Sequence, residues 1–184
     1  MIQRLVLVLV VLLSVAPAPA SADQNSPHLD KLFRRLAATT EPVQAAAIAR
    51  DIWRIWALPA DRSVSTPFAS GVIMMSHGNL TEALGDFDRV VGEAPDFAEG
   101  WNKRATVAYM MGDFDASIRD IQRTLALEPR HFGAMAGLAA IYQGMGKEEQ
   151  ALDILNKVKE IYPAMPGLDR QMKDLRAAIA AKDT

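Results

Sequence analysis

Two residues that interrupt helices recur with one period along most of this chain. The members of each set are 34 residues apart: the glycines are Gly78, Gly112 and Gly146, and the prolines are Pro95, Pro129 and Pro163. Glycine ends a helix by adopting a left-handed conformation, and proline cannot continue one. Because the two sets are offset by 17 residues, the period predicts a helical hairpin copied three times, over residues 64–97, 98–131 and 132–165.

Between these glycines and prolines, small and large residues recur at fixed positions of each repeat, as stacked hairpins require. Small residues recur where the two helices of one hairpin would cross, and they are Gly71, Ala105 and Ala139 in the first helices and Ala83, Ser117 and Ala151 in the second. Larger apolar residues, Phe87, Ile121 and Leu155, are expected to fill the space between hairpins. Each hairpin then leaves an apolar face that only its neighbour can bury, so stability depends on stacking.

This pattern resembles the tetratricopeptide repeat (TPR) family. The second repeat carries the signature residues Trp101, Ala105, Ala108, Gly112, Phe114, Ser117, Ile121 and Pro129. The third carries Met135, Leu138, Ala139, Tyr142, Gly146, Ala151, Leu155 and Pro163. The first repeat departs at Pro67, where Trp or Leu is usual. The resemblance implies an all-α right-handed solenoid, and the whole chain is similar to small periplasmic TPR proteins of Gram-negative bacteria.

The first 22 residues have the three parts of a secretory signal peptide. A positive start through Arg4 precedes an apolar run from Leu5 to Val15, and Ala20-Ser21-Ala22 forms a small-residue cleavage site. A membrane anchor is the rival interpretation, but the run of 11 residues is shorter than the roughly 20 that span a bilayer. We therefore expect cleavage after Ala22, no stable membrane insertion afterwards, and a periplasmic protein.

Helical segments are expected on both sides of the repeats. Residues 23–60 predict a divergent helical pair, in which Ser26-Pro27 starts the first helix, and we expect this pair to cover the open end of the array beside the first repeat. Residues 166–182 predict a capping helix with an apolar stripe of Leu168, Met172, Leu175 and Ile179. A membrane-surface role for this helix is less favoured because its charges are mixed.

Composition and motifs argue against several classes of function. The chain has 20 basic and 22 acidic residues, a balance that does not suit nucleic acid. Its three histidines, His28, His77 and His131, lack the spacing of a metal site, and the last two are expected in solvated turns. There is no Gly-x-Ser-x-Gly elbow and no cysteine. We therefore expect no catalysis, no cofactor and no metal.

The resemblance implies that a protein or peptide binds in a concave groove lined by the first helix of each hairpin. Carried onto this chain, the groove residues are Phe68, Val72, Met75, Asn102, Lys103, Thr106, Tyr109, Met110 and Gln143. Asn102, Lys103 and Tyr109 are expected to be its main polar contacts and to lie outside the core. The small residues of the third repeat, Gly133, Ala136, Gly137 and Ala140, either pack against the capping helix or leave room for a ligand.

The resemblance also allows one known specificity to be compared with this groove. TPR domains that clamp the C-terminal carboxylate of cytosolic chaperones use Lys, Asn and Arg at fixed groove positions. Here Phe68 and Val72 stand in the first row and Gly133 and Gly137 in the third, so the clamp is not expected.

The function indicated by these features is a non-catalytic periplasmic scaffold that binds a protein or peptide segment, in assembly or integrity of the cell envelope. Two alternatives stay open at this stage. One is a self-assembling structural component, and the other is an accessory subunit of an envelope enzyme.

Overall fold

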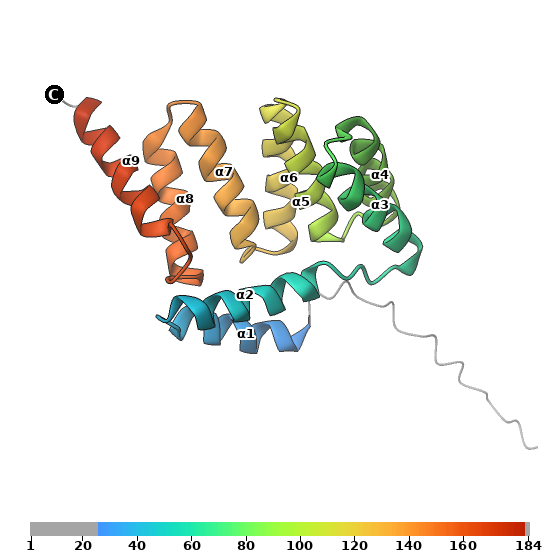
Figure 1. Cartoon of the computed structure of the whole chain (residues 1–184), viewed down its shortest axis with the longest axis horizontal. Helices are drawn as coiled ribbons and strands as arrows, with labels where there is room; N and C mark the ends of the chain where they lie inside the picture. The colour runs from blue at the N-terminus through green and yellow to red at the C-terminus, as the bar shows by residue number, and fades with distance from the viewer. Residues whose placement is uncertain (1–25, 183–184) are drawn as a thin grey trace, which may run out of the picture.

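Helices make up the regular structure of residues 26–182, the part of the chain that the computed structural model describes (Figure 1). In order they are α1 (Pro27–Ala38), α2 (Pro42–Trp56), the short 3-10 turn η2 (Arg62–Val64), α3 (Ser65–Ser76), α4 (Leu80–Glu93), α5 (Ala98–Met110), α6 (Phe114–Leu127), α7 (Phe132–Gly144), α8 (Glu148–Ile161) and α9 (Leu168–Lys182). The pairs α3/α4, α5/α6 and α7/α8 form the three predicted hairpins, and α9 packs on α8. The predicted signal peptide and its cleavage site lie outside the described residues.

The turns within the three hairpins share one geometry. Gly78, Gly112 and Gly146 have φ values of +79°, +81° and +69°. Immediately after each glycine, a backbone N–H donates to a carbonyl five residues earlier; these bonds run from Asn79 to Met74, from Asp113 to Ala108 and from Lys147 to Tyr142, each 2.9 Å long. Such bonds satisfy carbonyls that the helix end leaves free. The glycines therefore end the first helix of each hairpin, as the period predicts.

Several of the small residues lie buried between the two helices of their hairpins. A Cβ atom at Gly71 would lie 2.9 Å from the ring of Phe87. The hydroxyl of Ser117 donates to the carbonyl of Ala105 across 2.8 Å. Ala151 is fully buried in the third hairpin. A larger side chain at any of these positions would separate the two helices.

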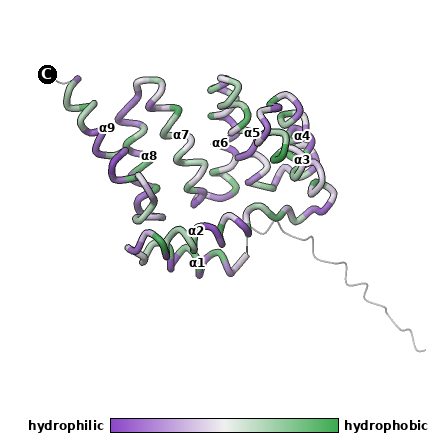
Figure 2. The backbone as a smooth tube through the Cα atoms, viewed as in Figure 1, coloured by the Kyte–Doolittle hydropathy of each residue, from purple (hydrophilic) through white to green (hydrophobic). Residues whose placement is uncertain are grey.

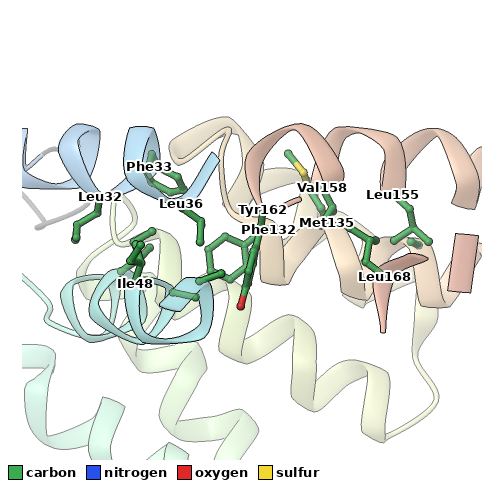
Figure 3. Packing of buried hydrophobic residues seen from close by; sticks show 14 of the residues in the cluster. Leu32, Phe33, Leu36, Ile48, Phe132, Met135, Leu155, Val158, Tyr162 and Leu168 are labelled. Carbon is green, nitrogen blue, oxygen red and sulfur yellow. The ribbon is translucent and has the colours of Figure 1, made fainter. Parts of the chain in front are cut away.

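The N-terminal helical pair has a different position from the predicted one. Instead of covering the first repeat, α1 and α2 run along the lower edge of the array in Figure 1, across the ends of the repeat helices. Their apolar faces share a core with α7, α8 and α9 (Figure 3), and its members include Leu32, Phe33, Leu36, Ile48, Phe132, Met135, Leu155, Val158, Tyr162 and Leu168. The expectation of a lid beside the first repeat is therefore wrong.

Contacts of α1 and α2 with residues at and just before the start of α7 explain this position. Trp56 is 2% exposed and packs on Phe132, with ring centroids 5.1 Å apart. Arg130, just before α7, donates to Asp30 of α1 across 2.7 Å and lies over the ring of Phe33. The pair thus buries its aromatic residues against the third repeat, and residues 57–64 lead back to α3.

Two smaller apolar cores lie elsewhere among the described residues. One lies in the first repeat and its junction with α5, around Phe68, Phe87 and Phe97. The other joins the second and third repeats and includes Ile121 and Leu138. Figure 2 shows hydrophilic and hydrophobic stretches alternating along the helices, as expected for helices buried on one face.

Candidate functional site

The first helices of the hairpins line two neighbouring pockets. The larger, which we call the α3 pocket, has a volume of about 670 Å³ and is lined by Trp53, Ala57, Leu58, Pro59, Ser65, Phe68, Ala69, Val72, Ile73, Glu99 and Lys103. The smaller, the α5/α7 pocket, has a volume of about 160 Å³ and is lined by Asn102, Ala105, Thr106, Tyr109, Ser117, Ile121, Gly133, Ala134, Gly137, Ala140 and Ile141. Both pockets therefore contain residues of the predicted groove.

Trp53 of α2 lies between the two pockets. It lines the α3 pocket, and its ring also covers Gly133 at the start of α7, where a Cβ atom would lie only 2.5 Å from the ring. The ammonium of Lys103 is 5.6 Å from the centre of this ring. The N-terminal pair thus contributes a wall of the site, although it is outside the three repeats.

A buried carboxylate beside Trp53 organises the polar groups of the site. Glu99, in the first turn of α5, is 1% exposed. Its Oε2 atom accepts from Nδ2 of Asn102 at 2.9 Å and lies 3.0 Å from Nε2 of His131. Nζ of Lys103 lies 3.1 Å from the other carboxylate oxygen. Three side chains, two from α5 and one from the N-cap of α7, therefore converge on one buried charge.

His131 is the N-cap residue of α7, and its two ring nitrogens have opposite roles. Its Nδ1 accepts from the backbone N–H of Ala134 at 3.1 Å, so Nε2 carries the proton and donates to Glu99. The imidazole is fully buried and stacks on Trp56, with ring centroids 4.1 Å apart and 9° between the planes. The expectation of a solvated turn is wrong for His131, because α2 covers this turn. His77 is exposed, as predicted.

The environment of Glu99 keeps this residue ionised. Burial raises the pKa of its carboxyl group, but the hydrogen bond from His131 and the positive charge of Lys103 oppose this effect. The pKa of Glu99 therefore lies below its ordinary value. The ionised carboxylate accepts hydrogen bonds from Asn102 of α5 and from His131 at the start of α7, so it joins the two helices.

Two of the predicted groove residues belong to the interior. Phe68 is 7% exposed, and its ring packs against Phe97 with centroids 5.1 Å apart. Asn102 is also 7% exposed and its amide is bound to Glu99. Each lines a pocket with its remaining surface, but the expectation that Asn102 lies outside the core is wrong. The reason is that Glu99 draws this amide inward.

The other predicted residues lie at the surface to different degrees. Tyr109 and Met110 are 45% and 49% exposed, and the ring of Tyr109 packs on Phe114. The half-buried groove residues are Val72, Met75, Lys103 and Thr106. Gln143 is exposed, and its side-chain oxygen accepts from Gln171 of α9 at 3.3 Å. Of the predicted polar contacts, Tyr109 is thus the one most open to a partner.

Of the two interpretations of the small residues in the third repeat, the structure supports the one in which they leave room, at Gly137 and Ala140. Gly133 packs closely, but against Trp53 of α2 and not against the capping helix. Gly137 and Ala140 line the α5/α7 pocket, and a Cβ atom at Gly137 would meet only Ile121, at 3.7 Å. Gly137 and Ala140 therefore leave room for a ligand.

Residues before the repeats form part of the site and were not anticipated from the sequence. Trp53, Leu58 and Pro59 line the α3 pocket. The two tryptophans at 53 and 56 are one helical turn apart, and this spacing indicates a common aromatic face. It does not indicate what the face covers.

Comparisons with known proteins agree with the repeat pattern. A family model described as "Tetratricopeptide repeat" matches residues 108–179. A TPR repeat-containing protein of Rhizobium etli is 32% identical over 156 residues, which cover 85% of this chain and 76% of that protein. This chain belongs to the tetratricopeptide repeat family. The peroxisomal targeting signal receptor of Yarrowia lipolytica is 30% identical over 92 residues, covering 50% of this chain and 15% of the receptor.

Solved TPR structures share the fold of this TPR protein. The first TPR domain of Spaghetti (RPAP3), bound to the HSP90 peptide SRMEEVD, has a TM-score of 0.61 at 18% identity and covers 64% of this chain and 93% of that one. The MamA protein also has a TM-score of 0.61 at 18% identity, covering 83% of this chain and 84% of that chain. TPR proteins are generally protein-binding scaffolds, and the first helices of all three repeats contribute to the two pockets here.

Within residues 26–182, no helix is both long and apolar enough to span a bilayer. In the same range, no three His, Cys, Asp or Glu side chains lie together as a metal site would require.

Proposed function

We propose that this TPR protein is a non-catalytic periplasmic scaffold that binds a segment of a partner protein along α3, α5 and α7, in assembly or integrity of the cell envelope. The observation that carries the proposal is the pair of cavities on these helices, bordered by the exposed side chains of Ile73 and Tyr109. Apolar pockets beside exposed aromatic and aliphatic side chains are typical of binding sites. A similar TPR fold holds a peptide in RPAP3.

The periplasmic part of the proposal rests on the N-terminal sequence. Export through the predicted signal peptide requires cleavage after Ala22, so the mature chain is expected to begin at Asp23. Mass spectrometry of the N-terminal peptide after cell fractionation tests this. An intact Met1 recovered with membranes after a salt wash contradicts the proposed location.

The binding part is tested by site-specific photo-crosslinking in intact cells. A photoreactive residue at Val72 or at Tyr109 lies in or beside a pocket. The matched control is Gln122, which is exposed on α6. We expect one set of crosslinked partners from Val72 and Tyr109 and none of that set from Gln122. The same partners from Gln122 alone would mean that binding takes place on the outer helices.

A further inference from the structure

The α5/α7 pocket has the size and polarity of a site for one large apolar side chain. None of its lining residues is charged. Two of its hydroxyl groups donate to backbone carbonyls, Thr106 to Asn102 at 2.9 Å and Ser117 to Ala105 at 2.8 Å. Its volume of about 160 Å³ is close to that of an engineered apolar cavity of about 150 Å³ that binds benzene.

The α3 pocket is also complementary to an uncharged group. Its two charged lining residues, Glu99 and Lys103, neutralise one another across 3.1 Å. Leu58 and Ile73 border it with 54% and 50% of their surfaces exposed. A charged side chain of a partner would lose its hydration in this pocket without gaining a free counter-charge.

The two pockets are neighbours along α5. Glu99 and Lys103 line one of them, and Asn102 and Thr106 line the other. Trp53 contacts both sides, because it lines the α3 pocket and covers Gly133 of the α5/α7 pocket. A single bound segment that crosses Trp53 can therefore place one side chain in each pocket.

We infer that the site recognises an uncharged segment of a partner protein through two large apolar side chains, one in each pocket and on opposite sides of Trp53. This inference rests on the proposed function and names the chemistry of the partner. The N-terminal pair sets the specificity, since Trp53 separates the two anchor positions.

The inference is tested with synthetic peptides in which two phenylalanines are joined by serine spacers of increasing length, with both ends blocked. Control peptides replace one phenylalanine by serine or by aspartate. Binding to the full mature protein is followed by NMR titration. Burying one Phe side chain contributes roughly 1.5–3 kcal/mol, so the best two-Phe peptide is expected to bind about ten-fold or more tightly than either single-Phe peptide.

Variants in which a larger side chain fills one pocket test whether each pocket binds one of the two phenylalanines. Gly137→Leu and Ala140→Leu each place a side chain in the α5/α7 pocket and should remove the gain from the second phenylalanine. Gly144→Leu makes a matched change on the same helix, where a Cβ atom meets nothing within 4 Å, and should bind as the wild type does. Ala69→Phe should fill the α3 pocket in the same way. Thermal melting checks that each variant is folded.

The possible results separate this inference from the proposed function. No peptide binding, equal binding of the aspartate control, or full binding by both α7 filling variants would overturn the inference. If both filling variants lose peptide binding but keep wild-type crosslinks at Tyr109 in cells, the inference is wrong for the cellular partner and the scaffold function stands. If the wild type gives no crosslinks at Val72 and Tyr109, the proposed function itself fails.

Discussion

The junction between the first and second repeats differs from the junction between the second and third, although both use the same helix positions. Phe97 and His131 are equivalent, each being the last residue of its repeat. Phe97 packs in an apolar cluster against Phe68. His131 instead binds the buried carboxylate of Glu99 and stacks on Trp56. The first junction is closed by repeat residues, whereas the second is completed by the N-terminal pair.

The two junctions also differ in how closely single positions are packed. At the first junction, Gly100 lies so close to Val90 that a Cβ atom would be 2.8 Å from its Cγ1 atom. At the second, a Cβ atom at Gly137 would be 3.7 Å from Ile121, and a cavity remains beside it. Both junctions leave a pocket, but the α3 pocket at the first junction is partly walled by α2, whereas the α5/α7 pocket at the second is lined by repeat helices alone.

The largest expected effect comes from removing the aromatic contact that holds α2. Trp56→Ala should cost about 3–5 kcal/mol, because it leaves a cavity between His131 and Phe132. Hydrogen exchange should show α1 and α2 losing protection before α3 and α4. The matched change at the first junction, Phe97→Ala, should reverse that order. Equal loss of protection in all helices of both variants would mean that the two junctions are not independent.

Overpacking at Gly133 should separate α2 from the third repeat with a smaller effect. Gly133→Ala forces the ring of Trp53 to move, because the added Cβ atom would lie 2.5 Å from it; the typical cost is about 1–3 kcal/mol. Chemical denaturation followed by tryptophan fluorescence measures this loss. Gly144→Ala on the same helix should cause no loss. If Gly133→Ala is equally harmless, Trp53 does not pack on α7 in solution.

Neutralising the buried carboxylate should weaken the second junction and change its response to acid. Glu99→Gln removes the charge that pairs with Lys103 and should cost about 1–3 kcal/mol at neutral pH. The pKa of Glu99 is lower in the folded chain than its ordinary value of 4.5. Its stabilising contribution is therefore present above about pH 4.5 and is lost as the pH falls through the folded-state pKa.

Denaturation curves over an acid series test this prediction. As the pH falls, the Glu99→Gln variant should lose less of its free energy of unfolding than the wild type does, because it has no carboxylate at this position to protonate. Glu93→Gln is a matched control, since Glu93 forms an exposed pair with Arg89 on α4, and its effect should be much smaller. Identical acid profiles for the wild type and Glu99→Gln would contradict the role given to this carboxylate.

The smallest effect is a gain in stability at Gly137 in the second junction. Gly137→Ala adds helix propensity and meets only Ile121 at van der Waals distance, so it should stabilise the protein by up to about 1 kcal/mol. Gly100→Ala at the first junction should destabilise it, because the added Cβ atom would clash with Val90. Melting temperatures give the sign of each change. A loss in both variants would show that position 137 is as closely packed as position 100.

The sequence by itself determined the repeats. The glycine turns, the prolines after the second helices, the small residues within each hairpin and the capping helix were all predictable. They depend on the conformational limits of single residues and on contacts between helices that follow one another in the chain. Of the candidate site, the helices that line it and the surface positions of Tyr109 and Met110 followed from the repeat positions.

Only the tertiary structure decided which junction receives the N-terminal pair, and with it the form of the site. The burial of Asn102 and His131, and the division of the groove by Trp53, depend on contacts between residues far apart in the chain. An apolar stripe on α2 shows that one face must be buried, but not against which partner. That choice depends on the fit of the Trp53 ring over Gly133, which has no local signal because it exists only when the two helices meet.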